Sequence, residues 1–198
     1  FLFKGQPGTG KTEAVKQLAR ILKRELFVVN TTALVDSKLG QTSKNVAALF
    51  KEIGRFSCPE RVLVLFDEID ALVLNRINSN DVREMGRVTS TFIREMDNLS
   101  KNVFLIATTN LYKLFDKALL RRFDAAVNFD RYTKDDLIDI AVETLKKIAS
   151  NNQNIKSDSR LFLKILNLSE QLPKPGELIS LIKKSIVFSN SNNKYEYL

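Results

Sequence analysis

The sequence contains no histidine and a single cysteine, Cys58, among its 198 residues. Without histidine, imidazole-based acid–base or nucleophilic catalysis is excluded, and with only one cysteine a Cys/His metal site is excluded as well. One cysteine cannot form an internal disulfide, which is compatible with a reducing compartment, and we expect a cytoplasmic location. Any catalysis must therefore use carboxylates, lysine, arginine, hydroxyls and a bound metal ion.

The sequence also lacks a long apolar run. No stretch approaches the roughly 20 residues that a membrane-spanning helix needs, so we expect no membrane segment in this piece of chain. Phe1 lies within the strand that leads into the first motif, so we expect a fragment of a longer protein. The lack of a signal peptide here then says little about the parent chain.

Acidic residues are fewer than basic ones, and the net charge is +8. Such a charge is compatible with nucleic acid or acidic partners. The lysines and arginines are scattered along most predicted helices, with no run longer than two. A solvated surface and a polyphosphate site explain most of this charge, so a nucleic-acid partner is possible but not favoured.

Near its start the chain carries Gly-Gln-Pro-Gly-Thr-Gly-Lys-Thr at residues 5–12, which fits the P-loop pattern G-x-x-x-x-G-K-[ST]. Glycines let the backbone turn so that successive N–H groups point at phosphate oxygens. Lys11 is expected to reach the β- and γ-phosphates, and the Thr12 hydroxyl to ligate Mg²⁺. The alternative is a glycine-rich turn that matches by chance. The predicted phosphate- and nucleotide-binding residues are Gly5, Pro7, Gly8, Thr9, Gly10, Lys11, Thr12 and Asp67.

In the predicted strand 61–66, the residues after Arg61 form a continuous apolar run, typical of a strand covered on both faces, and Asp67-Glu68-Ile69-Asp70 follows it. This pattern predicts a Walker B strand. Asp67 would hold Mg²⁺, usually through a water ligand, and Glu68 would polarise the attacking water as general base. The alternative is that acidic residues simply end a strand.

Strand and helix patterns alternate over residues 1–130, which predicts a parallel sheet of the three-layer α/β P-loop type. Ligands of such sheets bind beyond the carboxyl ends of the strands, where the P-loop, Asp67 and Asn110 are all expected. Asn110 could orient water or sense the γ-phosphate, although alone it would be an ordinary turn residue. The predicted strands cover residues 1–3, 26–29, 61–66, 103–107 and 125–129, and the predicted helices cover 11–24, 43–56, 82–99 and 117–121.

From residue 131 to 198 the pattern changes to helices, which predicts a small C-terminal helical lid domain after the nucleotide-binding domain of residues 1–130. Thr133-x-x-Asp136 resembles a helix start. The predicted helices cover residues 137–148, 161–168 and 177–188, with a polar loop at 75–81, a polar linker at 151–159 and a frayed end at 189–198.

Four segments, in this order and spacing, resemble the AAA family of AAA+ ATPases: GQPGTGKT, VLVLFDEID, IATTN and ALLRRFD. The resemblance is strong over residues 1 to about 130 and weak beyond. It implies ATP and Mg²⁺ as cofactors, the roles above for Lys11, Thr12, Asp67 and Glu68, and a sensor role for Asn110.

The resemblance also implies that Arg121 and Arg122 are arginine fingers, which reach the γ-phosphate bound by a neighbouring subunit. A planar guanidinium stabilises charge on a transferring phosphoryl group. The alternative is an ordinary surface pair. Fingers that act in trans predict a homo-oligomeric ring, with a hexamer expected.

Two positions depart from the family pattern. Lys38, in Lys38-Leu39-Gly40, stands where many protein-threading relatives carry an aromatic residue in the first pore loop, which puts an aromatic grip on polypeptide in doubt. The last helix opens with Glu177 and Leu178 and has no clear sensor 2 arginine, for which Lys174 is a weak substitute.

The resemblance favours an ATP-driven ring that remodels or unfolds proteins or complexes. One alternative is an AAA+ protein acting on nucleic acid, as a helicase or loader, which the basic charge favours slightly. Another is a nucleotide-dependent switch that hydrolyses little. The set of Asp67, Glu68, Asn110, Arg121 and Arg122 argues against the switch.

Overall fold

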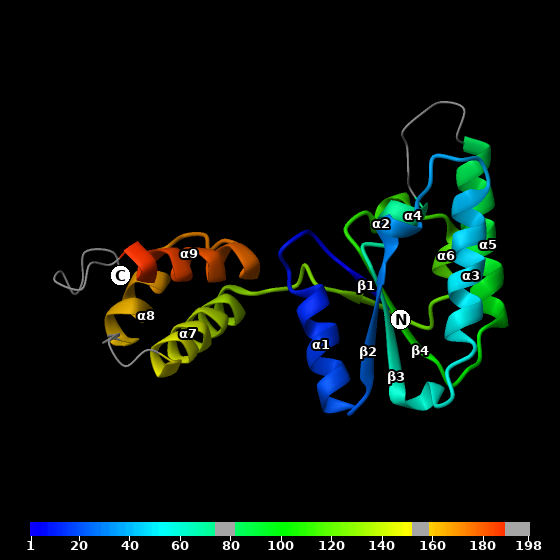
Figure 1. Ribbon diagram of the computed structural model, residues 1–198. Coiled ribbons are helices and arrows are strands. Elements are labelled where there is room, and N and C mark those ends of the chain that lie inside the picture. Colours follow the sequence, from blue (N-terminus) through cyan, green and yellow to red (C-terminus); the bar gives the residue numbers. More distant parts are fainter. Residues whose placement is uncertain (74–81, 152–158, 189–198) are drawn as a thin grey trace. The chain divides into compact units, whose positions relative to one another are not determined.

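The computed structural model describes residues 1–73, 82–151 and 159–188 (Figure 1). The chain forms two compact units. The first comprises residues 1–7 and 11–129, and the second comprises residues 8–10 together with 130–198, each with the gaps just given. The loop predicted at 75–81 and the frayed end predicted at 189–198 lie outside the described residues.

The described part of the first unit contains one sheet of five parallel strands in the order β2-β3-β4-β1-β5. This parallel α/β fold is the one that the sequence predicts. The register pairs Asn30 with Asp67, Phe66 with Ala107, and Lys4 with Thr109, so the carboxyl ends of four neighbouring strands line up. The strands are β1 (Leu2–Lys4), β2 (Glu25–Asn30), β3 (Val62–Asp67), β4 (Phe104–Thr109) and β5 (Ala126–Asn128).

Helices cover both faces of this sheet (Figure 1): α1 (Lys11–Ile21) lies on one face, and α3 (Gln41–Ile53) and α5 (Val82–Asn98) lie on the other. Alternate residues of β3 lie on opposite faces of the sheet, because successive side chains of a strand point in opposite directions. Leu63 and Leu65 belong to the core under α1, and Phe66 belongs to the core under α3 and α5. A strand buried on both faces must be apolar throughout, as residues 62–66 are.

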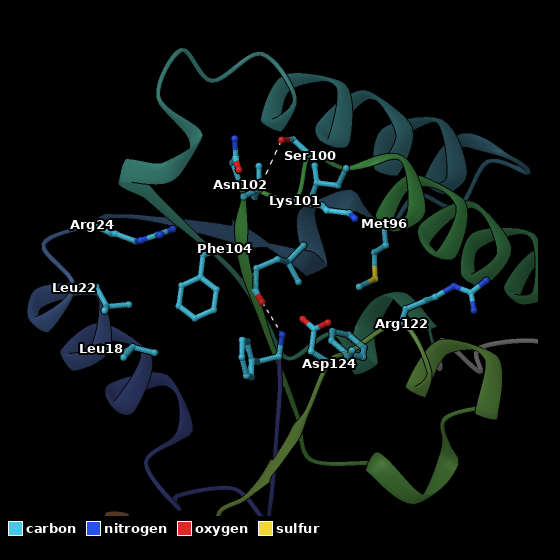
Figure 2. Close-up of a pocket in the computed structure, with 15 residues that line it drawn as sticks. Leu18, Leu22, Arg24, Met96, Ser100, Lys101, Asn102, Phe104, Arg122 and Asp124 are labelled. Atoms are coloured by element: carbon cyan, nitrogen blue, oxygen red, sulfur yellow. Dashed lines mark hydrogen bonds between the residues drawn. The ribbon is translucent and has the colours of Figure 1, made fainter.

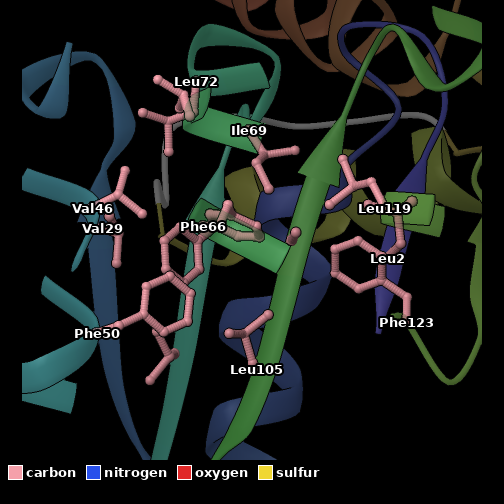
Figure 3. Packing of buried hydrophobic residues seen from close by; sticks show 14 of the residues in the cluster. Leu2, Val29, Val46, Phe50, Phe66, Ile69, Leu72, Leu105, Leu119 and Phe123 are labelled. Carbon is pink, nitrogen blue, oxygen red and sulfur yellow. The ribbon is translucent and has the colours of Figure 1, made fainter. Parts of the chain in front are cut away.

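Three phenylalanines of the larger core pack against one another. Two of them, Phe50 and Phe66, are labelled in Figure 3. The ring centroids of Phe50 on α3 and Phe66 on β3 lie 5.5 Å apart in a stacked arrangement, and each ring meets Phe92 of α5 edge-on at 5.2 Å. Aromatic pairs of this geometry contribute roughly 0.5–1.5 kcal/mol each beyond the area they bury. These contacts hold both helices against the strand that ends in Asp67.

Several elements differ in extent from the sequence prediction. Helix α1 ends at Ile21, not at residue 24, because Lys23 adopts a left-handed φ of 54°. The Arg24 and Lys23 N–H groups then bond back to Ala19 and Arg20, which is a Schellman cap. The helix predicted at residues 117–121 is α6 (Lys117–Leu120). The described residues also form four short elements that were not predicted: α2 (Thr31–Leu34), η1 (Pro59–Arg61), α4 (Asp70–Val73) and η2 (Tyr112–Leu114).

The second unit consists, in its described part, of α7 (Lys134–Asn151), α8 (Ser159–Leu168) and α9 (Pro175–Phe188) around an apolar core. The start of α7 is capped as its sequence predicts. The Asp136 carboxylate accepts hydrogen bonds from the Thr133 backbone N–H and hydroxyl, at 2.8 and 2.7 Å. None of the helices in the described ranges combines the length and the apolar composition that crossing a bilayer requires.

Candidate active site

Lys11 is the first residue of α1 and follows the glycine-rich loop directly. Gly8 and Gly10 have φ angles of 77° and 86°, which residues with a Cβ rarely adopt, so glycine is what lets this loop turn. The Lys11 side chain is only 7% exposed. Its Nζ donates to the backbone oxygens of Gly5 at 2.7 Å and Gln6 at 2.9 Å, and to Asn110 Oδ1 at 2.8 Å. The ammonium therefore joins the loop after β1 to the residue that follows β4.

Thr12 lies beside the acidic end of β3. Its hydroxyl donates to the two carboxylate oxygens of Asp67, at 2.9 and 3.1 Å. A hydroxyl and a carboxylate are oxygen ligands of the kind that Mg²⁺ prefers, so this pair fits that ion. The described residues contain no group of three or more His, Cys, Asp or Glu side chains arranged for a metal. Mg²⁺ needs no such cage, because it binds through one or two carboxylates, waters and substrate phosphates.

Glu68, the predicted base, follows β3 in an unusual conformation. Its φ of 51° lies in the left-handed region, and its side chain is exposed. Two buried threonine hydroxyls bond to this turn. Thr108 accepts the Glu68 N–H at 2.8 Å and donates to Asp67 at 2.7 Å, and Thr31 donates to the Asp67 carbonyl at 2.9 Å. Neither threonine was expected at the site from the sequence.

Asp70 is a further acidic residue whose part the sequence does not reveal. Its carboxylate accepts the Asn110 backbone N–H at 2.9 Å and the hydroxyl of Thr109, which is fully buried. Asp70 thereby fixes the turn that carries Asn110. The structure thus brings together Lys11, Thr12, Asp67 and Asn110 from three separate segments of the chain.

The two predicted arginine fingers lie elsewhere. Arg121 and Arg122 follow α6 and are both exposed. Arg122 Nε lies 2.8 Å from Asp97 Oδ1, near the end of α5, and the two side chains are 37% and 49% exposed. The structure therefore does not place Arg122 with Lys11 and Asp67 of its own chain.

Arg122 also lines a pocket of about 940 Å³ (Figure 2). The pocket wall includes Phe104, the first residue of β4, and Arg24, which immediately precedes β2. It therefore opens at the amino ends of the strands, whereas ligands of parallel α/β sheets bind at the carboxyl ends. This pocket is not the site that contains Lys11.

The two positions that depart from the family pattern are both exposed. Lys38 and Leu39 lie in the loop between α2 and α3, and Leu39 is 77% exposed. Lys174 belongs to the second unit and immediately precedes α9.

A parallel sheet whose first strand leads through a P-loop into a helix, with an acidic residue ending a buried strand beside it, defines a P-loop nucleoside triphosphatase fold. The model of the family described as "ATPase family associated with various cellular activities (AAA)" matches residues 1–131. This match covers about two thirds of the chain. The chain belongs to the AAA family of ATPases.

Individual relatives match the same region. An uncharacterized AAA family ATPase, y4kL of Sinorhizobium fredii, is 38% identical over 130 residues, which cover 66% of this chain and 38% of that protein. A candidate 26S proteasome regulatory subunit homolog of Methanothermobacter thermautotrophicus is 33% identical, over 65% of this chain and 34% of its own length. Peroxisomal ATPase pex6 of Schizosaccharomyces pombe is 38% identical, over 64% of this chain and 14% of its own. The chain thus spans well under half the length of these relatives.

Proposed function

We propose that the chain binds ATP with Mg²⁺ and hydrolyses it, as a subunit of a homo-oligomeric ring that remodels or unfolds proteins or protein complexes. One observation carries this proposal. Lys11 bonds to Asn110, and Thr12 bonds to Asp67, at the carboxyl ends of neighbouring parallel strands. That edge is where a P-loop sheet binds a nucleoside triphosphate.

Each residue has a defined part in this proposal. Lys11 holds the β- and γ-phosphates, while Thr12 and Asp67 hold the metal ion. Bound Mg²⁺ would neutralise charge that develops on the transferred phosphoryl group. Glu68 orients the attacking water and accepts its proton, and the Asn110 amide helps to place that water against the γ-phosphate.

The position of Arg122 supports a ring. It is exposed and paired with Asp97, close to a pocket at the amino ends of the strands, and not beside Lys11. A finger that completes a site must then serve a neighbouring copy. We propose that Arg121 and Arg122 act in this way, with the hexamer as the expected assembly.

A protein client is the proposed substrate, because the relatives include one named for a proteasome regulatory subunit. The exposed Leu39, next to Lys38, is the proposed client contact. Cys58 is free and exposed, which suits a reducing compartment such as the cytoplasm.

ATP hydrolysis by the chain and by its Glu68→Gln variant tests this function. We expect Mg²⁺-dependent turnover by the chain, and a variant that binds ATP but hydrolyses almost none. A Lys11→Ala variant is the matched control, since it should lose nucleotide binding itself. Undiminished turnover by Glu68→Gln would remove Glu68 as the base. Stimulation by unfolded protein supports the client class, whereas stimulation by DNA or RNA that weakens steeply with salt would favour the nucleic-acid alternative.

A further inference from the structure

The backbone of Glu68 is held in a conformation that glutamate disfavours. A residue with a Cβ at a φ of 51° is uncommon, and it persists where neighbouring contacts determine the conformation. The Glu68 side chain is exposed, so its own packing does not supply those contacts. Two main-chain hydrogen bonds border this turn, from the Ile69 N–H to the Thr108 carbonyl and from the Ala71 N–H to the Glu68 carbonyl. The side-chain hydrogen bonds to its main chain come from two threonines.

Thr108 belongs to β4, which lies next to β3 in the sheet. Its hydroxyl accepts the Glu68 N–H at 2.8 Å and donates its proton to Asp67 Oδ1 at 2.7 Å. One hydroxyl can donate one hydrogen bond and accept others, so both bonds form with the correct polarity. Thr108 is 1% exposed, which leaves water little access to either bond.

Thr31 lies on the opposite side of the same turn, immediately after β2, the other neighbour of β3. Its hydroxyl donates to the Asp67 carbonyl oxygen at 2.9 Å, with the Glu68 carbonyl oxygen as a longer acceptor at 3.3 Å. Thr31 is 3% exposed. Two buried hydroxyls, one on β4 and one immediately after β2, therefore hold the Asp67–Glu68 peptide from both sides.

We propose that Thr31 and Thr108 are positioning residues that keep Glu68 in its left-handed conformation and so aim its carboxylate. The inference rests on the proposed function, in which Glu68 is the base. Thr108 has a second effect through Asp67. Its hydroxyl donates to the Asp67 carboxylate, as the Thr12 hydroxyl also does, and so helps to keep that carboxylate in place.

The experiment compares Thr31→Val and Thr108→Val with Thr31→Ser and Thr108→Ser in the full chain. Valine keeps the shape and removes the hydroxyl, whereas serine keeps the hydroxyl. We expect each valine variant to lower kcat by roughly 10–100-fold, as loss of a supporting hydrogen bond does at other sites, with the affinity for a fluorescent ATP analogue nearly unchanged. Serine variants should keep most of the activity. Adding Thr31→Val to Glu68→Gln should slow turnover no further, because Thr31 bonds only to the main chain of this turn and acts through Glu68.

A second measurement needs no turnover: the φ of Glu68 from backbone ¹³C chemical shifts in the nucleotide-free chain. A positive φ in the wild type and serine variants, lost in the Thr31→Val/Thr108→Val double variant, supports the inference. A positive φ retained without both hydroxyls overturns it. If the double variant does not fold, each single valine variant is compared with its serine counterpart in the same way. A wild-type chain that hydrolyses no ATP would refute the proposed function, and the φ measurement would still decide this inference.

Discussion

The ammonium of Lys11 and the amide oxygen of Asn110 lie 2.8 Å apart, although the two residues are 99 positions apart in the sequence. The bond joins the start of α1 to the residue that follows β4, the neighbour of β1 in the sheet. The neutral Asn110 amide accepts a hydrogen bond from the buried ammonium but does not neutralise its positive charge. Lys11 can therefore exchange this acceptor for a phosphate oxygen, which would release the Asn110 amide to hold water.

Two replacements of Asn110 should separate turnover from binding. Asn110→Ala leaves Lys11 with the Gly5 and Gln6 carbonyls, so ATP affinity should be largely kept, while kcat should fall by about 10²-fold as positioning of water is lost. Asn110→Asp places a carboxylate next to the Lys11 ammonium and should weaken ATP binding instead. Equilibrium binding and steady-state turnover measure the two effects. Full kcat in Asn110→Ala would contradict the assigned part of Asn110.

Asp70 should matter for stability. Asp70→Ala leaves the Asn110 N–H and the fully buried Thr109 hydroxyl without their acceptor, so we expect a loss of about 1–3 kcal/mol in the free energy of unfolding. Urea unfolding measures the change, provided that the m-value stays constant. Asp70→Asn retains a side-chain oxygen and should lose less. An Asp70→Ala variant as stable as the wild type would contradict the assigned part of Asp70.

The sheet, and the cluster of Lys11, Thr12, Asp67 and Asn110 at the carboxyl ends of its strands, could be predicted because their sequence signals are local. The buried run before Asp67 and the P-loop before Lys11 each lie within a few consecutive residues. Parallel topology then places the carboxyl ends of neighbouring strands together, whatever the intervening sequence. Helix ends were less predictable, since the end of α1 depends on the left-handed backbone of Lys23.

Thr31, Asp70 and Thr108 could not be identified in the same way, because their parts depend on contacts between strands. A threonine is an ordinary strand residue, and an aspartate near a strand end is common. One signal does exist for Thr108 and Thr109: two hydroxyls directly after the buried run 103–107 need hydrogen-bond partners. Sequence alone does not say that those partners are Asp67, Glu68 and Asp70.

The cap of α7 should make stability depend on pH. The Thr133 backbone N–H, and then its hydroxyl, bond to the Asp136 carboxylate and hold the pKa of Asp136 below its ordinary value of 3.8. A lowered folded-state pKa means that the stabilisation is fully present above the unfolded pKa and is lost as pH falls through the folded one. The Tm advantage of the wild type over Asp136→Asn should therefore be constant at neutral pH and shrink below about pH 4. An advantage that persists unchanged in acid would contradict this.

The arginine fingers should be testable by mixing inactive subunits. Arg122 can leave Asp97 at little cost, since an exposed ion pair contributes only about 0–1 kcal/mol. The Arg121→Ala/Arg122→Ala variant should lose roughly 10³–10⁵-fold in turnover, and Glu68→Gln should be inactive for a different reason. If the fingers act in trans, mixed rings regain activity where the arginines of a Glu68→Gln subunit reach a neighbour with an intact Glu68. No recovery in assemblies that size-exclusion chromatography shows to be mixed would mean that the arginines do not complete a neighbour's site.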